Sequence, residues 1–300
     1  MRRLLLIGCG DIARRLMPLL VGRYHLFALL RHREEAAKWR AMGAVPLIGD
    51  LDRPATLRRL AGVAEIVIHL APPPNTGEVD QRTRHLLAAL AQPGQRPPQQ
   101  IVYISTSGVY GDCQGALVSE TRRPNPQTAR ARRRLDAETV LRDFGCRERT
   151  CVSILRVPGI YASDRLPLER LQRQLPALHP DEDVYTNHIH ADDLARVIVA
   201  ALRYGHPNRC YNVADDSALK MGEYFDAVAD HFHIPRPPRL TRSEIESRLT
   251  PLQVSFLRES RRLNNTRLKR ELGWQAHYPD VLAGLTSMIL EAGLEYTRAD

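Results

Sequence analysis

The segment LLLIGCGDIARRLMPLL, residues 4–20, joins a short apolar run to a glycine-rich turn and an amphipathic stretch. The apolar run is typical of a buried parallel strand, and the amphipathic stretch has the spacing of a helix. Gly8 and Gly10 permit a tight turn that a diphosphate can approach closely, and Ala13 is small enough for close packing of helix and strand. The start of the helix adds backbone N–H donors and the positive end of its dipole. This order of features predicts a turn that binds a dinucleotide.

Asp11 and Ile12 complete this turn, and we count both among the residues that bind the dinucleotide. Asp11 places an acid close to the expected phosphates, so a role in capping the helix is the alternative for this side chain. For the segment as a whole, the alternative is a glycine turn without a ligand.

A second apolar run, residues 24–30, ends at Arg31, His32 and Arg33. In sites that prefer NAD, an acid near this point bonds the ribose hydroxyls, whereas basic residues suit the 2′-phosphate of NADP. The first acid here is Glu34. We therefore expect NADP(H) rather than NAD(H), with Arg31 as the leading contact and Arg33 as the second. Charge that only faces solvent is the alternative.

Strand-like and helix-like segments alternate along the first two thirds of the chain. This alternation predicts an α/β protein with a doubly wound parallel sheet of the Rossmann type, whose ligands lie at the carboxyl ends of the strands. We expect residues 1–160 and about 184–213 to form the cofactor domain, with 184–190 returning to the main sheet. Residues 161–183 and 214–300 are expected to form a smaller C-terminal substrate-binding domain.

The composition limits the classes of partner. The chain has 300 residues, a hydrophobic fraction of 43% and a formal net charge of +9. The hydrophobic fraction excludes a mainly disordered chain. The positive charge fits either a solvated basic surface or an anionic ligand. Nucleic acid is not favoured, because the sequence contains no block of interleaved aromatic and basic residues.

The cysteines and the N-terminus bear on metal binding and location. The five cysteines are scattered and form no CxxC pair, so we expect no metal site and no disulfide framework. The apolar run after the first arginines is too short for a signal peptide or a membrane span. We therefore expect a soluble, cytoplasmic protein without a membrane partner.

Later motifs resemble those of a known family. The segments STSGVYGD (105–112), LRVPGIY (155–161), NHIHADDLA (187–195) and YNVADD (211–216) follow one another in its order. Together with the first turn, they resemble the extended short-chain dehydrogenase/reductases of the NAD(P)-dependent epimerase/dehydratase type. The GxGxxA spacing of the turn resembles the atypical branch of that superfamily.

The resemblance implies further site residues. Asp50 and Leu51 would lie against the adenine of the cofactor. The ribose side would be lined by Leu70, Ala71 and Pro72, and the nicotinamide would lie near Pro158, Gly159 and Ile160. Thr106 would take the place of the catalytic hydroxyl, which bonds a substrate oxygen.

The family's YxxxK base is missing. In the stretch PQTARARRRLDAE (126–138), the alignment puts Arg130 at the tyrosine and Arg134 at the lysine. A guanidinium stays protonated and cannot accept a proton at neutral pH, but it can hold an anion or polarise a carbonyl. Because the two arginines lie one helical turn apart, we expect both to face one pocket. Arg134 would also bond the cofactor ribose.

Other residues could move the proton in place of the tyrosine. Tyr110 is one candidate catalytic residue, and Tyr161, His188 and His190 are others. The resemblance implies a mainly structural role for His190, which braces the sheet against the following helix.

Two functions remain open at this point. The first is an NADP(H)-binding oxidoreductase of the sugar-nucleotide-modifying type, with a small anionic substrate held in part by Arg258, Arg261 and Arg262. The second is a catalytically silent, NADP-sensing regulatory protein. The resemblance also implies a homodimer that pairs through the helices at 78–91 and 128–145.

Overall fold

Seven parallel strands form the central sheet, in the order β11-β7-β5-β4-β1-β2-β3. The computed structural model describes residues 1–248, 250, 254 and 257–296. The strands of the sheet are β1 (Arg3–Ile7), β2 (His25–Leu30), β3 (Ala44–Ile48), β4 (Ile66–His69), β5 (Gln100–Thr106), β7 (Cys151–Val157) and β11 (Arg209–Asn212). The doubly wound Rossmann sheet predicted from the alternating segments is confirmed.

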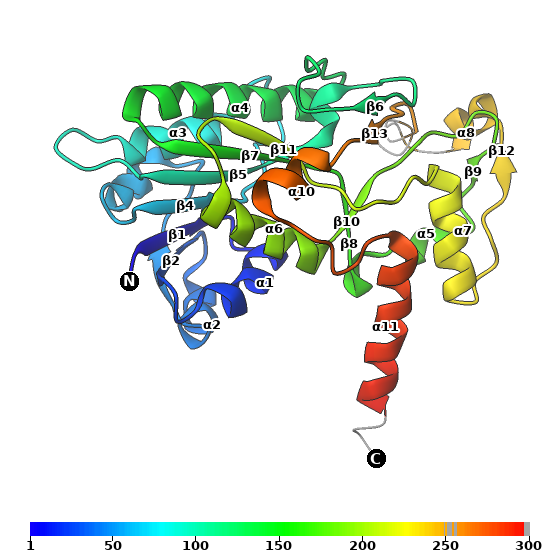
Figure 1. Ribbon diagram of the computed structural model, residues 1–300, viewed down its shortest axis with the longest axis horizontal. Coiled ribbons are helices and arrows are strands. Elements are labelled where there is room, and N and C mark those ends of the chain that lie inside the picture. The colour runs from blue at the N-terminus through cyan, green and yellow to red at the C-terminus, as the bar shows by residue number, and fades with distance from the viewer. Residues whose placement is uncertain (249, 251–253, 255–256, 297–300) are drawn as a thin grey trace.

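Helices cover both faces of this sheet, as Figure 1 shows. One face carries α1 (Asp11–Leu20), α2 (Ala36–Ala41) and α6 (Ala191–Tyr204). The other carries α3 (Gln81–Leu90), α4 (Ala129–Glu148) and the 3-10 helix η2 (Pro54–Leu60). Leu4 and Leu6 of β1 belong to the first core, and Leu5 and Ile7 belong to the second. The central strand is therefore apolar throughout because both of its faces are buried.

The chain reverses its direction of travel across the sheet between β3 and β4. It first runs outward from β1 to β2 and β3, and then returns to place β4 on the other side of β1. The backbone N–H of Leu70 donates to the carbonyl of Ile7 at 2.7 Å. The ends of β1 and β4 are therefore adjacent, while the connections after them lead to helices on opposite faces of the sheet. In open sheets of this kind, ligands bind beside such a pair of strand ends.

Segment 184–190 differs from the prediction. Only β10 (His188–His190) is a strand, and it pairs in parallel with β8 (Gly159–Tyr161) in a separate two-stranded sheet. It does not return to the main sheet, because β7 already has β5 and β11 as neighbours. The expectation for this segment was therefore wrong, and its residues lie beyond the carboxyl edge of the main sheet.

Short elements build the smaller part of the molecule around a separate apolar core. Two further parallel pairs join β6 (Leu117–Val118) to β13 (Arg262–Leu263) and β9 (Ala177–Leu178) to β12 (Arg239–Leu240). The helices of this part are α5 (Leu168–Gln172), α7 (Met221–His231), α8 (Arg242–Arg248) and α11 (Val281–Tyr296). Helix α10 (Thr266–Leu272) instead packs against α6 and β11, and its Leu268 and Leu272 belong to the core of the main sheet. Two 3-10 helices lie near the sheet edge, η3 (Ser107–Tyr110) and η4 (Ser163–Arg165), and η1 (Arg33–Glu35) follows β2.

A buried carboxylate attaches the C-terminal segment to helix α6. Asp193 is fully enclosed and accepts hydrogen bonds from the backbone N–H groups of His277 (3.1 Å) and Tyr278 (2.8 Å). It also accepts a bond from the Arg196 guanidinium at 3.1 Å. These contacts hold the segment before α11 against the sheet domain.

No helix in the described part of the chain is both long enough and apolar enough to cross a membrane.

Candidate functional site

A cavity of about 450 Å³ lies at the carboxyl ends of β1, β2, β3 and β4. Its lining includes most of the residues predicted to bind the cofactor: Gly8, Gly10, Arg31, Asp50, Leu51, Leu70, Ala71 and Pro72. Residues from four separate stretches of sequence therefore meet around one space, as the fold requires of a dinucleotide site.

The glycine turn fits a bound diphosphate. Gly8 has a φ of +90°, and a side-chain carbon on it would lie 2.4 Å from the Ala71 nitrogen, so only glycine is tolerated there. A side-chain carbon on Gly10 would meet no atom within 4 Å, so space is open beside this residue. Gly10 begins helix α1 without a side-chain cap. The first N–H groups of the helix are therefore not capped by a side chain and suit an anion.

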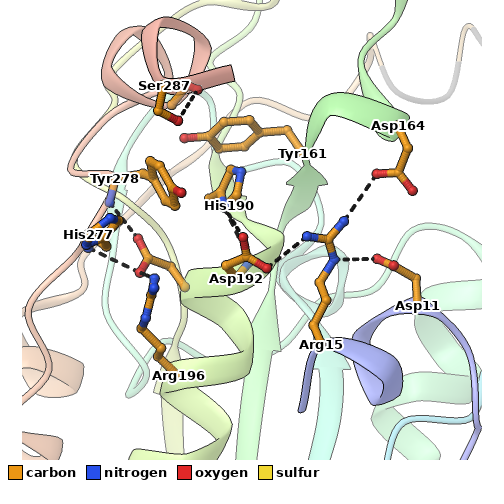
Figure 2. A network of polar contacts seen from close by, with 12 residues as sticks. Asp11, Arg15, Tyr161, Asp164, His190, Asp192, Arg196, His277, Tyr278 and Ser287 are labelled. Atoms are coloured by element: carbon orange, nitrogen blue, oxygen red, sulfur yellow. Dashed lines mark hydrogen bonds and ion pairs between the residues drawn. The ribbon is translucent and has the colours of Figure 1, made fainter. Parts of the chain in front are cut away.

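Asp11 does not cap helix α1, since Gly10 occupies that position. Its carboxylate instead pairs with Arg15 at 3.0 Å and with Arg165 at 3.1 Å. Figure 2 shows Arg15 between Asp11, Asp164 and Asp192. The two guanidinium groups offset the negative charge that Asp11 brings close to the turn.

Ile12, Ala13 and Asp11 follow the turn but do not line the cavity. Ala13 is fully buried within the core beneath the sheet, in agreement with its predicted packing role.

The rim of this cavity carries charges of both signs. Arg31 lines the cavity and donates from Nε to His32 Nε2 at 3.2 Å. Arg33 starts η1 and does not line it. Glu35 and Arg82 also line it and were not recognised in the sequence. Glu35 is the residue after Glu34, the first acid noted beyond the second strand. Arg82 belongs to helix α3, and no nearby sequence motif indicated that it would line this cavity.

A second cavity of about 590 Å³ lies between the ends of β5 and β7 and the smaller part of the molecule. It is lined by Thr106, Arg130, Pro158, Gly159 and Ile160, all of which were predicted for the reactive region. We refer to this space as the substrate cavity. The structure thus brings together the predicted hydroxyl, one of the two arginines and the residues expected beside the nicotinamide.

Thr106 ends strand β5 and begins η3. Its hydroxyl oxygen accepts a hydrogen bond from the Gly108 N–H at 3.2 Å, which fixes the side chain at the edge of the sheet. The hydroxyl hydrogen remains able to donate to a ligand in the substrate cavity.

Arg130 makes no hydrogen bond or ion pair with any residue that the structure describes, and its side chain lines the substrate cavity. Thr128 caps the helix by accepting from the Ala131 N–H, so Arg130 lies in the first turn of α4. The Arg130 side chain is exposed; partial desolvation, and after it the positive charges of Arg134 and Arg133, lower its pKa. An anion in the cavity would relieve this repulsion.

Arg134 does not reach the substrate cavity. Its side chain is 7% exposed, and Nη1 donates to the carbonyls of Ala71 (3.3 Å) and Ile104 (2.7 Å) and to Tyr103 Oη (3.0 Å). The expectation that Arg130 and Arg134 face one pocket was therefore wrong. The Arg134 side chain is directed at the sheet, where the carbonyls of Ala71 and Ile104 accept its hydrogen bonds.

The other proton-transfer candidates are placed differently from one another. Tyr110 is buried away from the substrate cavity and donates to Asn212 Oδ1 at 2.7 Å. Tyr161 lines the cavity but donates to the Asp280 carbonyl at 3.2 Å, and burial raises its pKa. His190 caps α6 by accepting from the Asp192 N–H. His188 lines the cavity, and burial lowers its pKa to about 3.

Three charged side chains in the substrate cavity come from the smaller part of the molecule. Arg165 reaches from η4 towards Asp11, and Glu259 pairs with Arg261 at 2.7 Å. Of the three arginines predicted near the C-terminus, only Arg261 lines the cavity. Arg258 pairs with Glu246, and Arg262 donates to the Gly115 carbonyl.

A buried ion pair supports the floor of the site. Glu138 accepts from Arg156 at 2.6 and 3.0 Å and from the Ser105 hydroxyl at 2.6 Å. All three side chains are almost fully enclosed. Glu138 is the last residue of the stretch quoted above for the missing base, and its partners Ser105 and Arg156 lie on β5 and β7.

No group of three or more His, Cys, Asp or Glu side chains in the described part of the chain could hold a metal ion.

Comparisons with known proteins agree with this geometry. A family model described as NAD(P)H-binding matches residues 8–204. Protein YeeZ of Escherichia coli (strain K12) is 26% identical over 183 residues, which are 61% of this chain and 60% of the length of YeeZ. A proposed NAD-dependent epimerase/dehydratase from Methylobacillus flagellatus is 27% identical, with 97% of this chain and 98% of that chain covered and a TM-score of 0.72.

A UDP-glucose 4-epimerase from Thermotoga maritima, solved with UDP-glucose, is 17% identical over 94% of this chain and 96% of its own, with a TM-score of 0.75. At this identity the likeness concerns the fold alone.

The parallel sheet and the glycine turn at its carboxyl edge define a dinucleotide-binding protein. This chain belongs to the NAD(P)H-binding family, among the epimerase/dehydratase-like proteins of the short-chain dehydrogenase/reductase superfamily.

Proposed function

We propose that this protein is an NADP(H)-dependent oxidoreductase of the epimerase/dehydratase type that acts on an anionic substrate, a sugar nucleotide. The observation that carries the proposal is the guanidinium of Arg130, which has no partner among the described residues and lines a cavity that also holds Thr106. A fixed positive charge beside a hydroxyl suits a substrate with a phosphate and a reacting oxygen.

The charges around the substrate cavity favour an anion. Arg130, Arg165 and Arg261 line it, whereas Glu259 is an acid in its wall and is already paired with Arg261. Among the structural relatives, the Thermotoga maritima enzyme is described with UDP-glucose, which carries a diphosphate. We propose that Arg130 contacts this part of the substrate or polarises its carbonyl.

Bound NADP(H) would supply or accept a hydride at the nicotinamide edge of the substrate cavity. Thr106 would orient the substrate oxygen through its hydroxyl hydrogen. Arg134 would position the cofactor loop indirectly, because it holds the carbonyl of Ala71, which lines the cofactor cavity. Residues 161–183 and 214–300 would supply the cover of the substrate cavity.

The cofactor preference rests on Arg31. Its guanidinium lines the cofactor cavity after β2, where a 2′-phosphate would lie, and Glu35 in the same rim would oppose that phosphate. We propose that the positive side chain determines the preference.

Fluorescence titrations with NADPH and NADH test this preference. We expect tighter binding of NADPH and a loss of that advantage of about tenfold or more in R31A. R33A is the matched control, because Arg33 does not line the cavity. Equal or tighter binding of NADH by the wild type would show that the preference is wrong.

Incubation with UDP-glucose and NADP⁺ tests the proposed activity. Formation of an altered sugar nucleotide or of NADPH supports an oxidoreductase. Absence of turnover in the wild type, together with turnover in R130Y, would identify a protein that binds the cofactor but lost its base.

A further inference from the structure

His188 lies in the wall of the substrate cavity, on the strand next to the residues expected beside the nicotinamide. In the parallel pair of β8 and β10, His188 is the direct partner of Gly159. The imidazole is 5% exposed and lies against the ring of Tyr224, with 4.1 Å between the ring centroids. Tyr161 meets it edge to face at 6.2 Å.

The main chain around His188 is held on both sides. The Asp215 N–H donates to the His188 carbonyl at 2.8 Å, and the Gly159 N–H donates to the Asn187 carbonyl at 3.2 Å. The ring therefore has a fixed backbone and two aromatic neighbours, and its position does not depend on a flexible loop.

The two ring nitrogens have different surroundings. Nδ1 is completely enclosed and has no hydrogen-bond partner among the described residues. Nε2 is on the ring edge that faces Gly159, where a side-chain carbon on the glycine would lie 3.4 Å from His188 Cδ2 and 4.0 Å from Nε2. Gly159 lines the substrate cavity, so this edge of the ring is the one nearest to a ligand.

These surroundings select one tautomer. Burial lowers the pKa of His188 to about 3, so the imidazole is neutral near pH 7 and carries a single N–H. A proton on Nδ1 would enclose a donor without an acceptor, which native structures avoid. With the proton on Nε2, the enclosed Nδ1 carries only a lone pair, and the Nε2–H is directed towards the substrate cavity.

We propose that His188 is a catalytic residue whose Nε2–H donates a hydrogen bond to the reacting oxygen of the substrate. This inference rests on the proposed function. Arg130 provides a fixed charge from the first turn of α4, whereas His188 lies directly beside Gly159 at the expected nicotinamide edge. A neutral N–H aimed at an oxygen stabilises the negative charge that forms there without being consumed.

The step balances without a proton from His188. In the reductive direction, the carbonyl carbon would gain a hydride with both of its electrons from bound NADPH, which would leave NADP⁺. The oxygen would gain one proton from a solvent water, which would leave as hydroxide, and the product would be an alcohol. The reverse direction would return the hydride to NADP⁺ and the proton to hydroxide. His188 keeps its proton on Nε2 throughout and lowers the energy of the charged oxygen.

The tautomer can be measured without any substrate. Long-range proton–nitrogen NMR spectra of the full chain with ¹⁵N-labelled histidine and NADP⁺ report which nitrogen carries the proton, and the spectrum of H188F assigns the signal. We expect a neutral ring protonated on Nε2 that does not change between about pH 5.5 and 8. A proton on Nδ1, or an imidazolium in this range, would overturn the proposal.

Two variants test the contact with the substrate, with UDP-glucose and NADP⁺ as the reactants. We expect H188F to keep its affinity for NADPH and its thermal stability but to lose about 100-fold in kcat, as removal of one such donor does elsewhere. H188Q, whose amide retains an N–H, is expected to recover part of that loss. An unchanged kcat in H188F would exclude the role.

Failure of the two proposals can be told apart. If the wild type does not act on UDP-glucose, the substrate class proposed above is wrong, and the NMR measurement still decides the tautomer. If the wild type acts on UDP-glucose but H188F is equally active, the function holds and the inference about His188 fails.

Discussion

Arg130 and Arg134 lie one helical turn apart, and their guanidinium groups nevertheless have different partners. Arg130 faces the substrate cavity without a partner among the described residues, whereas Arg134 is bound to two carbonyls and a tyrosine hydroxyl. Helical spacing predicted that both would share a face. It could not predict that Arg134 donates hydrogen bonds to the carbonyls of Ala71 and Ile104, because both residues are distant from Arg134 in the sequence.

At the same scale, the substitution R130A tests the anion site. The loss of one charged hydrogen bond is worth about 1.5–3 kcal/mol, which corresponds to a 10- to 100-fold weaker affinity for UDP-glucose. Isothermal titration measures this change. R132A is the control, because Arg132 pairs with Glu78 on the surface and does not line the cavity. Equal weakening in both variants would argue against a specific role for Arg130.

Asp215 gives a prediction that depends on pH. Burial raises the pKa of its carboxyl to about 7, and Oδ2 has no hydrogen-bond partner among the described residues. Between about pH 4 and 7 the unfolded chain releases this proton while the folded chain keeps it, so stability falls as pH rises. Its contribution is fully present below about pH 4 and is lost above about pH 7.

The substitution D215N removes the ionisation and keeps an oxygen that can accept from the Ser217 N–H. We expect its melting temperature to exceed that of the wild type by about 3 °C or more at pH 8, and to differ little at about pH 4. Scanning calorimetry at both pH values measures the difference. A stabilisation that is equal at the two pH values would contradict the explanation by ionisation.

At the scale of elements, the predicted strands of the main sheet were confirmed because buried parallel strands are continuous apolar runs. The parallel, doubly wound arrangement was confirmed as well, because strand–helix alternation favours it, whereas the order of the strands became known only from the structure. Segment 184–190 was assigned to the wrong sheet. A short apolar run indicates that a strand is buried, but it does not indicate which strand lies next to it. Here β8 and β10 pair with each other outside the main sheet.

Helix α4 is joined to the sheet by Arg134, and R134M tests this junction. Methionine retains the apolar stem but leaves the carbonyls of Ala71 and Ile104 and the hydroxyl of Tyr103 without their donor. We expect a loss of about 2–4 kcal/mol in the free energy of unfolding, measured with urea. R132A should change it by less than about 1 kcal/mol, because its ion pair is exposed.

At the scale of the whole molecule, the sheet domain and the C-terminal segment are joined through Asp193. Its carboxylate accepts the N–H groups of His277 and Tyr278 and is fully buried. Asp193 lies in the segment NHIHADDLA (187–195), which resembles the family pattern. That resemblance could not show the contact with residues 277–278, which depends on how the chain returns to α6.

The substitution D193A should release this attachment. The backbone N–H groups of His277 and Tyr278 would lose this acceptor, the second of them in a buried position, so we expect a loss of about 2–4 kcal/mol in stability and faster proteolytic cleavage before α11. D193N retains one oxygen acceptor and should lose less. Cleavage rates equal to those of the wild type would show that the carboxylate does not hold the segment.

The contact between Gly284 and Tyr161 has a consequence for how the protein is made. A side-chain carbon on Gly284 would lie 2.4 Å from Tyr161 Oη, and Tyr161 also donates to the Asp280 carbonyl. Helix α11 therefore fixes one wall of the substrate cavity. The ribosome delivers the N-terminal part of a chain first, and all strands of the main sheet precede Val213. A nascent chain acquires its dinucleotide cavity well before its second cavity is finished.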